Sequence, residues 1–265
     1  MRRVKSGALI VCLALVLVFP VLLSPNLAVT GIAVFTLILA IAVTGWNIFS
    51  GYTGYISLGH SAYYGLGAYT FALACQNWHI PGGFLPFLLL PLAGLVAGIC
   101  AIPLGWIVLH TRQHTFIVVT IALLFILQLL AFNLKSISGG SGGIFLPLTP
   151  WDAFTFDLPF YYIALGVLLL AIFVSWWLRH SKYGLGLLAI RDDEDRALGL
   201  GVKTGPSKLL AYVISAVFVG MAGALFGYYV GIIYPAGAFD PAVDVIIALA
   251  AFGGGLGTLA GPLLG

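Results

Sequence analysis

Apolar runs of roughly 20 residues follow one another along the chain and constrain its fold more than any other feature. A helix of that length crosses a bilayer and satisfies its own backbone hydrogen bonds. About eight runs qualify. They are Gly7 to Leu23, Leu27 to Phe49, Thr53 to Cys75, Phe84 to Leu109, Thr115 to Leu134, Phe160 to Leu178, Leu209 to Ile233, and a last run from Val243 onward. We therefore predict an all-α, polytopic bundle of integral membrane helices, with residues 1–265 forming a single transmembrane domain.

Composition agrees with a membrane protein. Only 7% of the residues are charged and 62% are hydrophobic, whereas about 25% are charged in soluble domains. Cys12, Cys75 and Cys100 lie in or beside apolar runs, at spacings typical of neither a disulfide framework nor a metal site. The net charge is +3, but the basic residues stand at the ends of apolar runs rather than on one face, so we expect no nucleic-acid partner.

Basic residues also predict which side of the membrane each loop occupies. Arg2, Arg3 and Lys5 place the N-terminus in the cytoplasm by the positive-inside rule. Counting crossings puts the segment from Arg179 to Lys208 on the same side, and it carries six of the eleven Lys and Arg residues. Lys135 falls outside, where a single lysine at a helix end can snorkel. The first run exceeds the roughly 7 to 15 residues of a signal-peptide core, so we expect an uncleaved helix.

The third run combines glycine, tyrosine and hydroxyl side chains without a formal charge. Its stretch GYTGYISLGHSAYYGLGAYTFALA extends from Gly51 to Ala74. Glycines here can be close-packing positions, with tyrosines as interfacial anchors. Polar side chains inside a bilayer are costly and indicate a functional site, so for His60 a packing role and a place on a solute path both stay open. The candidate path residues in this run are Tyr52, Ser57, Gly59, His60, Tyr63, Tyr64 and Gly65.

Half of the eight acidic residues stand consecutively in the segment predicted to be cytoplasmic. Asp192 to Asp195 suit the first turn of a helix, and Gly199 and Gly201 suit its end, which predicts a short helix from about Asp192 to Leu200. A solvated loop that only fixes topology is the alternative. A charged helix displayed there would suit docking of a soluble partner. The candidate docking residues are Arg191, Asp192, Asp193, Glu194, Asp195, Arg196, Ala197 and Leu198.

Motifs for nucleotide or metal binding are weak. The nearest fragment to a phosphate loop, Gly201 to Thr204, lacks the glycine before lysine that lets backbone amides wrap a phosphate. His110 and His114 stand four apart, as zinc ligands on a helix can, but no Asp, Glu or Cys accompanies them. That favours a solvated helix boundary. We expect no metal site and no cofactor.

Two rival functions depend on acidic residues in the membrane. An enzyme using His60 with Ser57 or a tyrosine as an acid/base set would need a carboxylate to orient the histidine. A secondary carrier would need an Asp or Glu to bind its coupling ion. The acids outside the cytoplasmic segment all map near the external face, so we expect neither function and no catalytic residues. These acids are Asp152, Asp157, Asp240 and Asp244.

Four segments, in order, resemble those of one family. Gly51 to Tyr69 resembles the signature near the third helix of branched-chain amino-acid ABC-importer permeases of the LivM type. Gly139 to Gly143 is similar to the external glycine loop of that family, Ser181 to Ala197 to its cytoplasmic coupling segment, and Gly253 to Gly265 to its late glycine-rich helix. On this resemblance Ser141 joins the candidate substrate path.

The resemblance implies a transport subunit without chemistry of its own, in a bacterial inner membrane. It implies a heterodimer with a sister permease, driven by two cytoplasmic ATP-binding subunits through residues 179–208 and fed by an external, periplasmic binding protein. Urea and short-amide permeases carry similar glycine motifs, so they remain the alternative to branched-chain amino acids. Family members continue beyond Gly265, so we expect one or two further helices.

Overall fold

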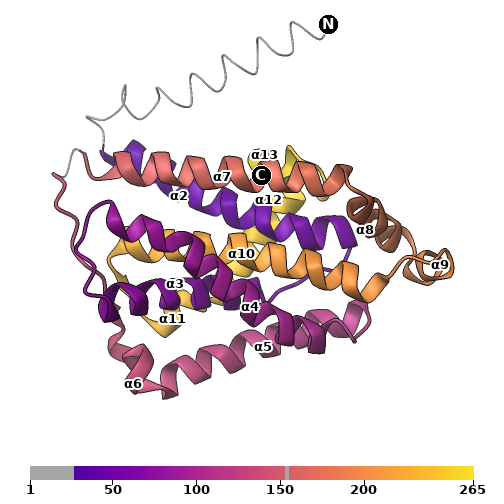
Figure 1. The fold of residues 1–265 in the computed structure, drawn as a ribbon, viewed down its shortest axis with the longest axis horizontal. Coiled ribbons are helices and arrows are strands. Elements are labelled where there is room, and N and C mark those ends of the chain that lie inside the picture. Colours follow the sequence, from indigo (N-terminus) through magenta and orange to yellow (C-terminus); the bar gives the residue numbers. More distant parts are fainter. Residues whose placement is uncertain (1–26, 153–154) are drawn as a thin grey trace, which may run out of the picture.

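The computed structural model describes residues 27–152 and 155–265, which form a bundle of helices (Figure 1). Six segments of this part of the chain are long and apolar enough to cross a membrane. The prediction of an all-α, polytopic membrane bundle is confirmed, while the predicted run from Gly7 to Leu23 lies outside the described residues. The long helices are α2 (Leu27–Trp46), α3 (His60–Asn77), α4 (Leu90–Val108), α5 (Gln113–Asn133), α7 (Asp157–His180), α10 (Thr204–Val230) and α12 (Pro241–Gly254).

Short elements join the long helices. Strands β1 (Ile144–Phe145) and β2 (Ile232–Ile233) pair antiparallel and fasten the loop after α6 to the end of α10. The other short elements are α6 (Lys135–Ser138), α8 (Lys182–Asp192), α9 (Glu194–Gly199), α11 (Pro235–Ala238), α13 (Gly261–Leu264), the π-helix η1 (Asn47–Gly51) and the 3-10 helices η2 (Leu85–Leu89) and η3 (Gly140–Gly142).

Helix α10 occupies the centre and packs against α2, α3 and α4. Its contact with α3 depends on small residues. A Cβ on Gly67 would lie 2.0 Å from the carbonyl oxygen of Gly220, and a Cβ on Gly223 would lie 2.0 Å from that of Tyr64. Lipid tails are as apolar as the helix surfaces, so the hydrophobic effect does not drive helices together in a membrane. Van der Waals contacts at close approach stabilise the pair instead. Glycine therefore decides how close these two helices come.

Two runs predicted as continuous helices are interrupted. The run from Thr53 contains irregular backbone at residues 54–59, and α3 begins only at His60. The last run breaks after α12, where Gly255 and Gly257 have φ of 109° and 73°. Glycine adopts this left-handed region without a Cβ clash, and nearby polar groups satisfy the freed backbone. The predicted late glycine-rich helix is thus a helix, a loop and a final turn.

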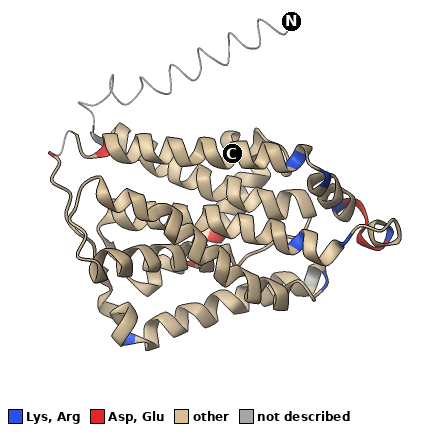
Figure 2. Cartoon of the chain, viewed as in Figure 1, with Lys and Arg blue, Asp and Glu red and all other residues tan. Residues whose placement is uncertain are grey.

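Charge is segregated between the two ends of the bundle. Figure 2 shows that Lys and Arg gather around α8 and α9. Lys135 begins α6, which lies at the opposite end with the glycine loop of η3 (Figure 1). The predicted sidedness rests on this segregation.

Candidate functional site

The irregular residues 54–59, which we call the break, bring polar side chains into the bundle interior. His60 is fully buried at the start of α3. Its Nδ1 lies 2.8 Å from Ser57 Oγ, and its Nε2 lies 2.7 Å from the Oγ of Ser215 on α10. A hydroxyl can donate or accept, so neutral imidazole is satisfied in either tautomer. His60 thus bridges the break and α10 about 16 Å along the α10 axis from its start.

Asp244 caps α3 from another helix. It is 1% exposed in the first turn of α12, where its Oδ1 accepts a hydrogen bond from Ser61 N at 3.0 Å and its Oδ2 accepts one from Ser61 Oγ at 2.6 Å. A helix that begins inside a bundle leaves N–H groups without water, and its positive end favours a carboxylate. The predicted position of Asp244 near the external face is therefore wrong.

Asn47 joins the other side of the break to the loop after α12. Its Nδ2 donates to the carbonyl of Thr258 at 3.0 Å, and its Oδ1 accepts from Gly257 N at 2.8 Å. Arg179 donates to the carbonyl of Gly257 at 2.7 Å. Side chains from α7 and η1 thereby satisfy the irregular backbone of this loop.

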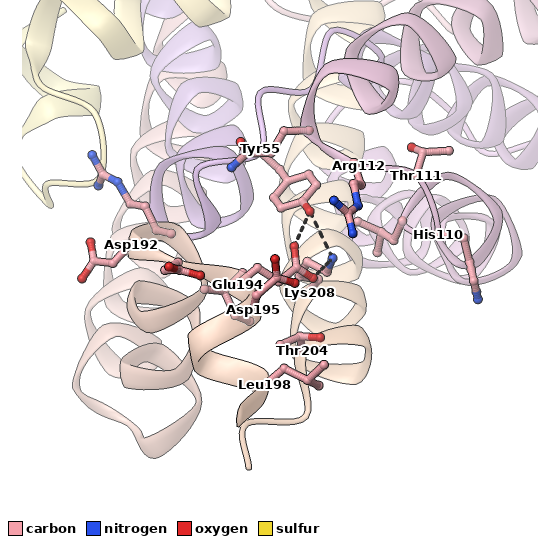
Figure 3. A pocket seen from close by; sticks show the side chains of 15 residues that line it. Tyr55, His110, Thr111, Arg112, Asp192, Glu194, Asp195, Leu198, Thr204 and Lys208 are labelled. Atoms are coloured by element: carbon pink, nitrogen blue, oxygen red, sulfur yellow. Dashed lines mark hydrogen bonds and ion pairs between the residues drawn. The ribbon is translucent and has the colours of Figure 1, made fainter. Parts of the chain in front are cut away.

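A second polar cluster lies at the basic end of the bundle. The Tyr55 hydroxyl, from the break, donates a hydrogen bond to Glu194 of α9. Lys208 of α10 places its Nζ 2.5 Å from Glu194 Oε1 and 4.5 Å from the centroid of the Tyr55 ring. Figure 3 shows the three side chains converging, each from a different segment. Glu194 is therefore half-buried and bonded to side chains of its own chain.

The contacts in this cluster shift two pKa values. Burial alone would raise the pKa of the Glu194 carboxyl, but the hydrogen bonds from Lys208 and Tyr55 outweigh it and hold that pKa below its usual value. Burial, and then the bond to Glu194, raise the pKa of the Tyr55 phenol. The pair is consequently a phenol donating to a carboxylate near neutral pH.

The cluster borders a cleft of about 550 Å³ between the α4–α5 loop and the α8–α9 segment. Arg112 projects into it from the α4–α5 loop, facing Tyr55 and Glu194 (Figure 3). Asp192 and Asp195 line the same cleft. Both signs of charge thus face this opening.

The other candidate docking residues divide between internal and external positions. Arg191 donates to the carbonyl of Gly51 at 3.0 Å, and Ala197 is buried. Asp193 accepts from Arg196 N at 3.0 Å and pairs with the Arg196 guanidinium at 2.9 Å, which caps α9. The predicted single helix is instead the end of α8 and a separate α9, because Asp193 has extended backbone with φ of −164°. The exposed members are Arg191, Asp192, Asp195, Arg196 and Leu198.

Two predicted path residues lie beside the His60 centre rather than in it. The Tyr52 hydroxyl lies 2.7 Å from Ser175 Oγ on α7. The Tyr63 hydroxyl donates to that of Tyr212 on α10 at 3.2 Å. Each is a buried contact between helices.

The remaining path candidates occupy close contacts or the opposite end. A Cβ on Gly59 would lie 2.4 Å from the carbonyl oxygen of Thr120, and one on Gly65 would lie 2.5 Å from the Phe239 ring. Tyr64 lines a cavity of about 240 Å³ with residues of α10, α11 and β2. Ser141 is exposed in η3. The structure thus brings Ser57, Gly59 and His60 together and leaves Ser141 apart.

Sequence reasoning missed several partners. Ser215 and Asn47 carry no distinguishing motif, so only the fold pairs them with the break. The sequence alone indicates for Lys208 only a basic residue that fixes topology. Glu194 and Ala197 are three apart and so share a helix face, which was a readable sign that Glu194 faces inward.

Comparison with known proteins identifies the family of this bundle. Residues 28–265 match the family described as "Branched-chain amino acid transport system / permease component". The chain belongs to this permease family. The resemblance noted from its glycine motifs is thereby confirmed.

Two relatives in the permease family are LivM proteins, described as high-affinity branched-chain amino acid transport system permease proteins. The chain is 31% identical to LivM of Escherichia coli (strain K12), covering 93% of this chain and 63% of the relative. It is 32% identical to LivM of Salmonella typhimurium, covering 84% of this chain and 58% of the relative. The chain thus spans less than two thirds of their length.

A LivH permease protein of the same transport system in Salmonella typhimurium is 25% identical, covering 85% of this chain and 77% of the relative. No solved structure matches the chain significantly.

Proposed function

We propose that this chain is a LivM-type permease subunit of an ABC importer for branched-chain amino acids. The observation that carries the proposal is the family match over residues 28–265, supported by LivM relatives whose names state that function. The subunit conducts the solute and catalyses no reaction, since ATP is hydrolysed on separate subunits.

The partners follow from the same proposal. A sister permease of the LivH type completes the path, two ATP-binding subunits dock on the cytoplasmic side, and an external binding protein delivers the amino acid. The complex resides in a bacterial inner membrane. The α8–α9 segment, within residues 179–208, is the docking element, with exposed Asp192, Asp195 and Leu198 available to a partner.

The solute passes along the break and α3. Ser57 and His60 supply neutral polar groups there, and the start of α3 supplies backbone amides close to Asp244. Broken helices in transporters present such termini to zwitterionic solutes. Tyr64 and Gly65 continue the path toward α11, and Ser141 lies at its external mouth. Tyr52 and Tyr63 support its wall.

Purification and reconstitution test the function. A tagged full-length chain is purified from its host membrane, and the complex is placed in proteoliposomes with ATP and radiolabelled leucine, isoleucine or valine. We expect a soluble ATPase to co-purify and uptake to require ATP. ATP-dependent uptake of radiolabelled urea or acetamide, without uptake of the three amino acids, would replace the substrate class with short amides. Purification without an ATPase would overturn the importer.

A cation-coupled secondary carrier is the second candidate function, and the position of Asp244 is the observation that favours it. A cation-coupled carrier needs an intramembrane carboxylate, and Asp244 is one. Its hydrogen bonds to Ser61 assign it a capping role instead. Uptake by proteoliposomes that lack ATP but carry an ion gradient would favour the carrier.

A further inference from the structure

The break is held from the α8–α9 segment at two points. Arg191, near the end of α8, donates to the carbonyl of Gly51 just before the break. Glu194, the first residue of α9, accepts from the Tyr55 hydroxyl inside it. Between these two anchors Asp193 is extended and joins α8 to α9. A displacement of the α8–α9 segment therefore acts on the break through named bonds.

Lys208 connects the same point to the central helix. It is 4% exposed, bonds Glu194, and lies over the Tyr55 ring. Ser215 lies seven residues after Lys208 on α10, about two helical turns further along, and bonds His60. The break is consequently fastened to α10 at both of its ends, by Lys208 through Glu194 and by Ser215 through His60.

We propose that Tyr55, Glu194 and Lys208 form a relay that converts movement of the docked α8–α9 segment into movement of the break. The inference rests on the proposed function and assigns Tyr55 and Lys208 as positioning residues for transport. Neither residue needs to touch the solute or the ATPase, because each acts through Glu194.

The chemistry of the three groups suits a relay better than a passive surface contact. Exposed ion pairs contribute little and exchange freely with water. A buried lysine that loses its carboxylate partner is strongly disfavoured, so Lys208 and Glu194 move together. The Tyr55 hydroxyl adds a directional bond that places the break in the same unit.

The experiment measures coupling in the intact complex. Tyr55→Phe removes only the hydroxyl, Glu194→Gln keeps the shape but removes the charge, and Lys208→Arg retains a cation. We expect the first two complexes to assemble with their ATPase and to hydrolyse ATP, while ATP consumed per amino acid imported rises about tenfold, the scale of one charge-assisted hydrogen bond. Lys208→Arg should stay closer to wild type than Lys208→Met.

Matched controls separate the relay from general damage. Tyr162→Phe and Lys135→Met remove the same groups from exposed positions outside residues 179–208 and should leave the ratio unchanged. The double variant Tyr55→Phe with Glu194→Gln should be no worse than the worse single variant, since both break one relay. Additive losses, or a wild-type ratio in both single variants, would overturn the relay.

Failure of the relay and failure of the proposed function look different. If wild-type complex shows no ATP-driven uptake, the proposed function is wrong. If wild type transports and the variants remain coupled, only the relay is wrong. If only the Lys208→Met complex fails to assemble, the ratio of ATP consumed to amino acid imported in Tyr55→Phe tests the relay. That variant keeps the aromatic ring and its packing.

Discussion

Asp244 is the residue on which the start of α3 depends. Asp244→Asn retains one acceptor for Ser61 N but loses the charge that the helix N-terminus favours. We expect the variant to be less stable by about 1 to 3 kcal/mol, as for other charged hydrogen bonds. Thermal unfolding in detergent measures it, with Asp152→Asn at an exposed position as the matched control. Equal melting of both variants would contradict the capping role.

Glu194 makes the anchoring of α9 depend on pH. Its pKa in the folded chain lies below the usual 4.5, so the unfolded segment binds the proton more readily. The stabilisation is therefore present above about pH 4.5 and is lost as the pH falls through the folded pKa. Lys208 and Arg112 are the basic side chains that face Glu194 in this cluster.

Hydrogen exchange at residues 194–199 between pH 6 and pH 3 checks this dependence. We expect protection to fall with pH in wild type and to fall less in Glu194→Gln. Asp195→Asn, exposed and one residue away, should behave as wild type. Identical profiles for wild type and Glu194→Gln would contradict the assigned shift.

At the scale of elements, the α3–α10 contact predicts which glycines tolerate a methyl group. Gly67→Ala forces a Cβ against the Gly220 carbonyl, and overpacking of this kind costs about 1 to 3 kcal/mol. Gly166→Ala on α7 meets no atom within 4 Å and gains helix propensity. We expect the first variant to melt lower and the second to melt at or above wild type. A Gly67→Ala protein as stable as Gly166→Ala would show that the two helices are not packed this closely.

Helices were predictable from the sequence, and their interruptions were not. The length of the apolar runs was enough to locate the spanning helices, because any helix that crosses a bilayer needs about 20 apolar residues. The break required knowing that Ser57, Ser215 and Asp244 meet around His60, and these residues come from distant parts of the chain. Glycine content at Gly54 and Gly255 permitted irregular backbone without specifying it. The partner toward which the Glu194 side chain points likewise could not be predicted, because it depends on where Lys208 lies in the fold.

At the scale of the whole molecule, charge predicts how the bundle sits in its membrane. The α8–α9 end carries most of the described Lys and Arg residues (Figure 2), and basic loops are retained in the cytoplasm. The glycine loop with Ser141 lies at the other end and should face outward (Figure 1). Single cysteines at Ser141 and Asp195, both exposed, report the two ends once Cys12, Cys75 and Cys100 are replaced by Ala or Ser.

Labelling of intact cells with a membrane-impermeant maleimide then tests the orientation. Ser141→Cys should react in intact cells, whereas Asp195→Cys should react only after the membrane is opened. The two positions control for each other, because permeabilised cells must label both. Reaction of Asp195→Cys in intact cells would show that the bundle has the opposite orientation. The α8–α9 segment would then lie outside the cell, where no cytoplasmic ATPase reaches it. The relay through Tyr55 and Lys208 would then have no source of movement, so this measurement precedes the coupling experiments.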